Sequence, residues 1–345
     1  MKKLDVICEG EPKDESKSST TNNKQLVPVE EVDEQWVYYR GENFSANEAK
    51  FLSRFDREFP PITDVVRRDE IGGLDKILDQ IETFKTGINH RSLYHIFGSR
   101  PPRGFILQGP PGVGKTMIAK YIATDLGATF VDLPLSKFES KWVGQAASNL
   151  MEILDKGRKY HQLTRRPVMY FFDEAEEALK DRSLGGWHGP RVNVLLREMD
   201  GLGNNEGLLF GGATNHLDKI DPAILRPGRM DYVITIPEYT SLMMADVFRA
   251  TATRLNRLAP HHEPFKADKK DFERLGRLAK DKKLRPADVG EIYRRAVDVK
   301  VSWVTSLPGN TPVTGEDSFI LPSAIEQQIN VYDREGKGSV GRVGF

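Results

Sequence analysis

Cysteine is almost absent from this chain of 345 residues, since Cys8 is the only one. A single thiol cannot form an internal disulfide, so a disulfide framework is excluded and the usage is typical of a reducing compartment. Long apolar runs are also missing, because no stretch approaches the roughly 20 residues that a membrane-spanning helix needs. The opening residues, MKKLDVICEG, have too short an apolar segment for a secretory signal and turn acidic after it. We therefore expect a cytoplasmic protein with no membrane span.

The chain has no excess of either charge. It carries 50 Lys and Arg residues against 50 Asp and Glu residues. This balance gives no global attraction to nucleic acid or to an anionic membrane, so a nucleic-acid partner is disfavoured. Residues 11–25 have very little apolar content, which predicts a disordered segment near the start of the chain.

What the chain does contain is a glycine-rich loop between an apolar run and a predicted helix. Residues 109–116 read GPPGVGKT and follow the apolar residues 105–107. Its three glycines let the backbone wrap closely around phosphates, with N–H groups and a helix N-terminus pointing at anionic oxygens. Lys115 would reach the β and γ phosphates, and the Thr116 hydroxyl would bind Mg²⁺. We expect a nucleoside triphosphate here, and the alternative is an ordinary strand-to-helix turn. The predicted binding residues are Gly109, Pro110, Pro111, Gly112, Val113, Gly114, Lys115, Thr116 and Met117.

Two acidic residues follow a second apolar run. Residues 167–172 read PVMYFF, which suits a strand buried on both faces, and Asp173 and Glu174 come directly after it. Ligands of doubly wound sheets bind at the carboxyl ends of the strands. This position would bring Asp173 to the Mg²⁺ ion and Glu174, as general base, to a water facing the γ-phosphate. The alternative is a solvated strand end.

The apolar pattern predicts two successive domains after an N-terminal extension. Runs near 104–108, 129–133, 168–172, 207–213 and 232–236 alternate with helical stretches, which predicts an α/β fold with a five-stranded parallel sheet. Helical patterns near 241–256, 270–280, 287–303 and 322–331 follow it and predict an all-helical lid. The predicted boundaries are an extension over 1–61, an ATP-binding domain over 62–239, a lid over 240–332 and a loose tail over 333–345.

The extension carries one apolar stripe. Phe51, Leu52, Phe55 and Phe59 recur at helical spacing before a proline pair. We expect this predicted helix to pack on the ATP-binding domain of its own or a neighbouring chain, and the alternative is a partner-binding helix.

Two further motifs point to phosphoryl transfer. A buried strand pattern over 208–213 ends near Asn215, whose amide can bond both a water and a phosphate oxygen and so orient the attacking water. Arg226 and Arg229 then follow on a proline and glycine turn. Guanidinium groups held on such a turn suit the charge that develops on a transferring phosphoryl group. Taken alone, two loop arginines are usually solvated.

Together these motifs resemble the AAA family of ATPases, in the form shared by proteasomal regulatory ATPases, valosin-containing-protein-type unfoldases and membrane AAA proteases. The resemblance runs from about Asp69 to about residue 331. It implies a P-loop NTPase fold with a helical lid, ATP and Mg²⁺ as cofactors, and a ring, expected to be a homohexamer. It also implies that Ile71 and Gly72 line the adenine pocket, and that Arg226 and Arg229 act on the neighbouring subunit's nucleotide.

The resemblance also assigns a pore loop. Residues 138–144 read FESKWVG and fall between the second strand and the next helix. Here Lys141, Trp142, Val143 and Gly144 match the family loop that projects into the central channel. Trp142 offers a large rigid apolar area with little rotamer entropy, which suits gripping an extended polypeptide without sequence preference. The alternative is a core tryptophan. Trp187 sits where the family places its second pore loop, and its position is left open.

Several positions depart from the family pattern. Thr251 stands where many relatives have a histidine near the nucleotide, so that contact is in doubt. Arg285 opens a later lid helix and is either a sensor arginine or solvated. No HEXXH motif is present, and the end of the chain lacks a penultimate tyrosine. A protease activity and a proteasome partner are therefore not expected.

The leading hypothesis is an ATP-driven protein remodeller that threads a polypeptide substrate through a ring. A second hypothesis is an assembly factor in which ATP switches ring assembly without threading. A third, weaker one is a nucleic-acid motor or loader of the kind found in other branches of the superfamily. The balanced charge and the loop around Trp142 favour the first.

Overall fold

The computed structural model describes residues 36–39, 42–62, 65–133, 145–180, 189–200, 207–259, 263–306 and 319–332. The chain divides into two compact units, Met1–Ala49 and Lys50–Phe345. In the first unit, strand β1 (Trp36–Tyr39) pairs antiparallel with β2 (Glu42–Ser45). Helix α1 (Ala46–Glu58) follows directly. Ser45 begins it with a capping box, because the Glu48 carboxylate accepts from the Ser45 backbone N–H at 3.0 Å and the Glu48 N–H reaches the Ser45 hydroxyl.

The second unit is built on a five-stranded parallel sheet. Its strands are β3 (Gly104–Gln108), β4 (Thr129–Asp132), β5 (Val168–Phe172), β6 (Leu208–Thr214) and β7 (Tyr232–Thr235). They lie in the order β4-β5-β6-β3-β7, and all pairs are parallel. Every residue of β5 and β6 is buried, which explains why these strands read as continuous apolar runs. The predicted α/β fold with a five-stranded parallel sheet is confirmed.

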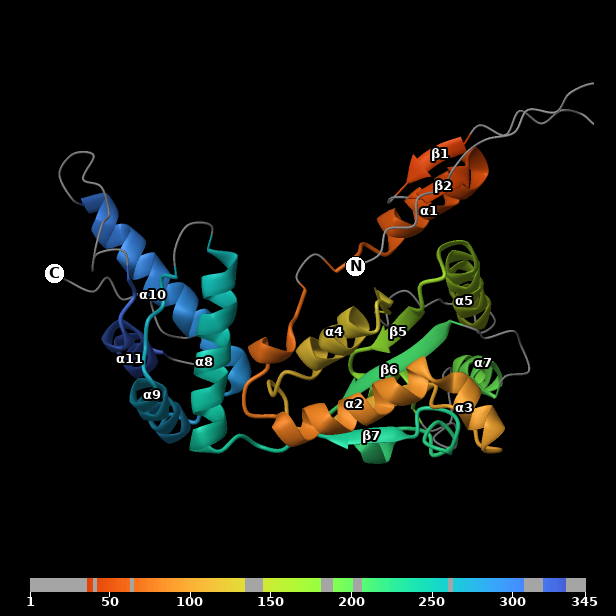
Figure 1. Ribbon diagram of the computed structural model, residues 1–345. Helices are drawn as coiled ribbons and strands as arrows, with labels where there is room; N and C mark the ends of the chain where they lie inside the picture. The colour runs from red at the N-terminus through yellow and green to blue at the C-terminus, as the bar shows by residue number, and fades with distance from the viewer. Residues whose placement is uncertain are drawn as a thin grey trace, which may run out of the picture. The chain divides into compact units, whose positions relative to one another are not determined.

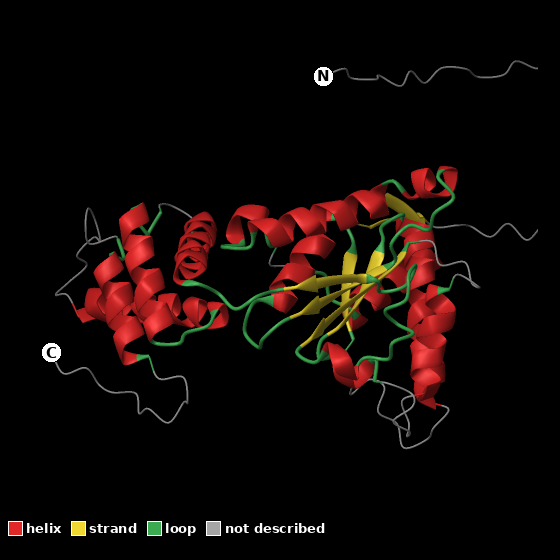
Figure 2. Cartoon of the chain, turned by 90° about the horizontal axis from the view of Figure 1, so that it is seen from below, coloured by secondary structure: helices red, strands yellow, loops and turns green. Residues whose placement is uncertain are grey.

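Helices flank this sheet (Figures 1 and 2). They are α2 (Asp75–Asn89), α3 (Arg91–Ile96), α4 (Lys115–Asp125), α5 (Gln145–Thr164), α6 (Ala175–Ala178) and α7 (Gly189–Met199). The short 3-10 helices η1 (Arg68–Glu70) and η4 (Leu217–Lys219) stand before α2 and after β6. The core includes Phe84, Phe105, Ile118 and Phe171, none of which exposes any surface. The phosphate loop therefore leaves a strand whose first four residues are buried and enters a helix with one buried face.

Four helices complete the second unit. They are α8 (Ser241–Leu258), α9 (Lys269–Asp281), α10 (Pro286–Ser306) and α11 (Pro322–Val331), and Figure 1 shows them gathered as one group. The backbones of α8 and α9 approach closely at Gly276, where a Cβ would lie 2.3 Å from the Ser241 carbonyl oxygen. The predicted helical region after the sheet is confirmed. Within the described ranges, no helix has the length and apolar character to cross a membrane.

The apolar stripe of the extension packs in its own chain. The Phe55 ring stacks on Tyr160 of α5 with the ring centroids 4.4 Å apart, and Lys156 forms an ion pair with Glu58 at 3.0 Å. Leu52 and Phe59 are buried as well. Of the alternatives for this stripe, the structure supports packing on the α/β region of the same chain.

Candidate nucleotide-binding site

The phosphate loop joins the end of β3 to the start of α4. Gly112 and Gly114 adopt left-handed φ angles of 80° and 91°, which L side chains rarely adopt. Gly114 is the residue that caps α4. The first N–H groups of a helix have no hydrogen-bond partner within the helix. The loop and the N-terminus of α4 can therefore both direct backbone N–H groups toward a bound phosphate.

The Lys115 ammonium lies under this loop. Its Nζ donates to the carbonyl oxygens of Gly109 at 2.8 Å and Pro110 at 2.9 Å, and to Asn215 Oδ1 at 2.8 Å. Lys115 is 9% exposed, and burial lowers its pKa below the usual value even though Asp173 and Glu176 act to raise it. An anionic phosphate placed in this loop would compete with three neutral oxygens for the same ammonium.

The acidic pair stands at the carboxyl end of β5. Thr116 Oγ1 donates to Asp173 Oδ2 at 3.1 Å, so the two predicted metal ligands are in contact. Glu174 is exposed and adopts the left-handed conformation with φ 53° and ψ 50°. A non-glycine residue held in this region is strained, and such residues cluster at functional sites.

A cavity of about 660 Å³ lies between these groups. Nine predicted site residues line it, and four residues that the sequence analysis did not single out complete it. Asp132 is the most informative of the four, because it ends β4 at the same sheet edge as Asp173 and obeys the same rule. The nine are Pro111, Gly112, Gly114, Lys115, Thr116, Met117, Asp173, Glu174 and Asn215, and the four are Asp132, Leu133, Ala213 and Ala287.

A second cavity of about 420 Å³ lies on another side of the loop. Pro110 and Val113 line it together with Arg285, Lys280 and Lys283. The Arg285 side chain lies against Gly112, where a Cβ would be 2.8 Å from its Cδ. The next turn of α10 touches the loop as well, because the Ala287 N–H donates to the Gly112 carbonyl at 3.1 Å. Arg285 is thus beside the loop, but it lines this second cavity and not the first.

The two residues predicted to line the adenine pocket belong to neither cavity lining. Ile71 is 6% exposed. Gly72 packs on the backbone of α8, where a Cβ would lie 2.2 Å from the Asp246 carbonyl oxygen. Thr251, on the same helix, donates its hydroxyl to the Val247 carbonyl at 2.8 Å, within α8.

The buried carboxylate of Glu176 contacts the backbone of Asn215. The Asn215 backbone N–H donates to Glu176 Oε1 at 3.4 Å. Glu176 is 6% exposed, and within the described part of the chain its Oε2 has no hydrogen-bond partner. The sequence analysis missed Glu176, although it stands two residues after Glu174.

The two arginines of the turn after β6 lie in different surroundings. Arg229 donates from Nε and Nη2 to the two carboxylate oxygens of Asp200, each at 2.7 Å, and its Nη1 contacts the Ala223 carbonyl. The hydrogen bond from Arg229 holds the pKa of Asp200 below its usual range. Arg226 is exposed, and neither arginine lines the cavity of the phosphate loop.

The predicted pore loop Lys141, Trp142, Val143 and Gly144 lies outside the described residues, and so does Trp187. Their placement in a channel stays a prediction.

The oxygen donors at the cavity fit the Mg²⁺ ion that the motifs imply. The Thr116 hydroxyl and the Asp173 carboxylate are hard ligands in contact with each other. In the part of the chain that the structure describes, no group of three or more His, Cys, Asp or Glu side chains could hold a metal. Mg²⁺ sites of this type take their remaining ligands from phosphates and water.

Comparison with protein families gives one match for the region built around this cavity. Residues 105–238 match the family model described as the ATPase family associated with various cellular activities, abbreviated AAA. The matched span runs from β3 to just beyond β7. It therefore includes the phosphate loop, the acidic pair, Asn215 and both arginines of the turn.

Proposed function

Residues 105–238 belong to the AAA family of ATPases, and from this premise we propose that the chain couples ATP hydrolysis to the remodelling of a polypeptide in an oligomeric ring. The family supports ATPase activity and implies a nucleotide bound with Mg²⁺, and its members commonly form rings. The threading of a polypeptide, the homohexamer and the cytoplasmic location are the proposed refinements.

One observation carries the hydrolytic part of the proposal. Lys115, Thr116, Asp173, Glu174 and Asn215 come from three separate elements, and all of them line the same cavity. A cation on the phosphates, a metal-binding pair, a carboxylate and an amide are the groups that phosphoryl transfer to water requires.

Each of these side chains has a distinct role in the proposed reaction. Thr116 and Asp173 would hold Mg²⁺, which when bound supplies positive charge to the β and γ phosphates. The Lys115 ammonium would exchange its hydrogen bonds to three protein oxygens for contacts with the phosphates. The Glu174 carboxylate would accept a proton from the attacking water, which the freed Asn215 amide would orient.

The position of the turn arginines supports catalysis between subunits. Arg226 and Arg229 stand outside the lining of their own chain's cavity. The exposed Arg226 guanidinium is free to reach the γ-phosphate of a neighbouring copy, which a ring would bring to it, whereas Arg229 is held on the same turn by Asp200.

The proposal that the ring acts on a polypeptide comes from the residue types at 141–144. Trp142 would grip an extended chain through its apolar area, while Gly144 would let the loop move. An assembly factor switched by ATP without threading is the alternative from a different class.

A trapping experiment tests the proposed function. Glu174→Gln should bind ATP, lose turnover and retain a polypeptide that is eluted when ATP is exchanged for ADP. Trp142→Ala should keep basal hydrolysis, and adding it to Glu174→Gln should release the trapped polypeptide. Retention that is unchanged in the double variant would rule out Trp142 as the gripping residue. Oligomers that form with ATP and trap nothing would favour the assembly switch.

A further inference from the structure

The segment before α2 lies along helix α8. We call residues 65–73 the strap. At one end, Arg257 of α8 donates from Nε to Glu70 Oε1 at 2.6 Å and from Nη2 to the Val65 carbonyl at 3.3 Å. At the other end, Gly73 lies against Met243, where a Cβ would be 2.9 Å from the Met243 Cα. From Met243 to Arg257 an α-helix rises roughly 20 Å, so the strap follows α8 for several turns.

The carboxylate that anchors the strap to α8 is almost completely buried. The Glu70 side chain is 1% exposed, and its second oxygen accepts from the Arg67 backbone N–H at 3.2 Å. Arg254 lies nearby, with its Nε 4.0 Å from Glu70 Oε2. Removing one partner of a buried ion pair leaves the other charge uncompensated, so this contact constrains the strap more strongly than an exposed pair would.

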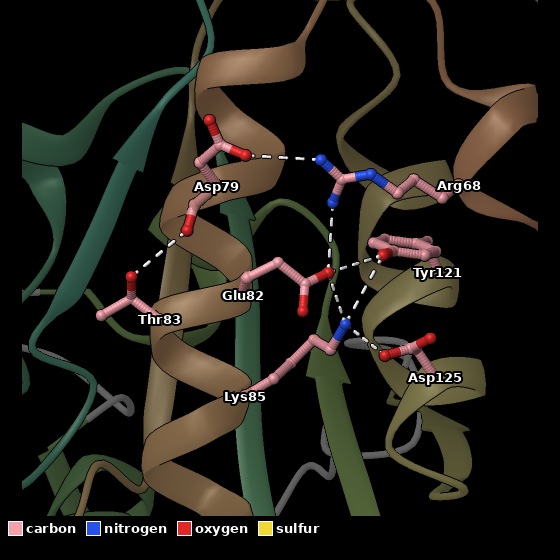
Figure 3. A network of polar contacts seen from close by, with 7 residues as sticks. All are labelled: Arg68, Asp79, Glu82, Thr83, Lys85, Tyr121 and Asp125. Atoms are coloured by element: carbon pink, nitrogen blue, oxygen red, sulfur yellow. Dashed lines mark hydrogen bonds and ion pairs between the residues drawn. The ribbon is translucent and has the colours of Figure 1, made fainter.

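A second, more exposed anchor ties the strap to α2, which contacts the helix of the phosphate loop in turn. Figure 3 shows Arg68 between two carboxylates of α2, with Nη1 3.2 Å from Glu82 Oε1 and Nη2 3.3 Å from Asp79 Oδ1. Glu82 in turn accepts from Lys85 at 2.7 Å and from the Tyr121 hydroxyl at 3.1 Å. Tyr121 belongs to α4, the helix that begins at Lys115.

The two anchors directly precede the residues that are proposed to meet the nucleotide base. Arg68 is fixed toward α2 and α4, while Glu70 is fixed toward α8, and Ile71 and Gly72 follow immediately. Gly72 has no room for a side chain against α8. Consequently the position of Ile71 and Gly72 depends on where the ion pair of Glu70 holds α8, whereas the phosphate loop has no direct contact with that ion pair among the described hydrogen bonds and ion pairs.

We propose that Glu70 is a positioning residue for nucleotide binding, which through Arg257 holds the strap and α8 together beside Ile71 and Gly72, the two residues proposed to contact the base. The inference rests on the proposed ATPase function. It differs from a purely structural role, because it predicts a loss that is confined to ligands carrying a base. The phosphate loop should bind a ligand made only of phosphates equally well with or without this ion pair.

Calorimetric titration of the full chain with ADP and with inorganic pyrophosphate, both with Mg²⁺, tests this inference. Glu70→Gln and Arg257→Ala should each weaken ADP binding about tenfold, the effect expected from losing one charged hydrogen bond, and leave pyrophosphate binding within about twofold. The double variant should be no weaker than either single one, because both changes break the same contact. Arg257→Lys, which keeps the charge, should recover most of the ADP affinity.

Arg249→Ala is the matched control. Arg249 pairs with Asp246 on the same helix at 3.0 Å, but both side chains are exposed, so its loss should not change ADP affinity. The inference is overturned if Glu70→Gln keeps the wild-type ADP affinity, or if ADP and pyrophosphate weaken together, which would indicate general destabilisation. Thermal melts of each variant identify that second case. A wild-type chain that binds neither ADP nor ATP would instead overturn the proposed function itself.

Discussion

Arg229 forms a bidentate ion pair with Asp200, in which each carboxylate oxygen accepts one hydrogen bond at 2.7 Å. The Arg229 side chain is only 15% exposed, whereas Arg226, three residues earlier on the same turn, is exposed. A bidentate pair fixes the guanidinium in one plane. The two arginines that the sequence treats as equivalent therefore differ in their freedom to reach a neighbouring nucleotide.

This difference predicts two distinct phenotypes for the arginines. Arg226→Ala should lower kcat by about 10³ or more and leave both ADP affinity and the melting temperature unchanged, because an exposed finger is lost. Arg229→Ala should also abolish turnover and spare ATP binding, because the turn that presents Arg226 loses its contacts to Asp200 and Ala223, and for the same reason it should lower the melting temperature. Steady-state ATPase assays and thermal melts measure both effects.

Mixing subunits provides the control for action between chains. Lys115→Ala chains cannot bind nucleotide but keep their arginines, so they should restore hydrolysis to Arg226→Ala chains when the two are mixed. If Arg226→Ala retains full ATPase activity, the proposal that this arginine acts in the site of a neighbouring chain is wrong.

The lowered pKa of Lys115 predicts that nucleotide binding takes up protons at alkaline pH. Burial favours the neutral amine, so the ammonium begins to lose its proton below the usual pH range for lysine. A triphosphate beside Lys115 favours the charged form and raises its pKa again. ATP affinity should therefore fall as the pH rises through the lowered pKa, while protons are taken up on binding.

Calorimetry in two buffers of different ionisation enthalpy measures this uptake. Glu174→Gln, which keeps Lys115 in place, should show the same uptake as the wild type. Identical binding enthalpies in the two buffers at alkaline pH would contradict the prediction.

The left-handed backbone conformation of Glu174 predicts that a substitution can raise the stability of the fold and abolish hydrolysis at the same time. Glycine adopts the left-handed region at no steric cost, so Glu174→Gly should relieve strain and stabilise the fold by up to about 1 kcal/mol while abolishing hydrolysis. Glu174→Gln also removes the base but keeps the side chain, so its stability should stay near that of the wild type. Urea denaturation compares the three proteins. A glycine variant that is less stable than the glutamine variant would mean that the relieved strain is smaller than the extra chain entropy that glycine loses on folding, which would contradict the prediction.

Strands and the phosphate loop could be predicted from sequence because their signals are local. Strands β5 and β6 are short apolar runs in which every residue is buried, and β3 and β4 are buried except at their last residue. The predicted and observed strand boundaries agree closely, even for the more exposed β7. The β1 and β2 hairpin was missed, because Glu42–Ser45 has little apolar character. Asp132 stands at the carboxyl end of a parallel strand, as Asp173 does. This cavity residue could therefore have been predicted from the sequence by the same rule.

Contacts between distant segments could not be predicted in the same way. Asp200 and Arg229 lie 29 residues apart, and Glu70 and Arg257 lie 187 apart. Charged residues are common on this chain, and nothing in their local pattern selects these partners. Only the packing of the helices and the turn onto the sheet decides which acid meets which arginine.

The ion-pair network of Figure 3 predicts that Lys85 contributes strongly to stability. Its side chain is 7% exposed, and the ammonium contacts Glu82, Asp125 and the Tyr121 hydroxyl. Burial acts to lower the pKa of Lys85, but the hydrogen bonds to Asp125 and Glu82 outweigh it and raise the pKa above the usual value. The stabilisation is therefore present below the unfolded-state pKa, near 10.5, and is lost as the pH rises through the higher folded-state pKa.

Lys85→Met should lower the free energy of unfolding by about 1 to 3 kcal/mol at neutral pH, because two carboxylates lose their shared cation. The loss falls short of a fully buried pair, since Glu82 and Asp125 are themselves half-exposed. Lys156→Met is the matched control: Lys156 also bridges two carboxylates, Glu58 and Glu152, but it is 31% exposed and should cost under about 1 kcal/mol. Urea denaturation at pH 7 measures both variants, and equal losses would mean that burial of Lys85 adds nothing to the pair. Because the network joins α2 to the helix of the phosphate loop, Lys85→Met should also weaken pyrophosphate binding, which Glu70→Gln should leave unchanged.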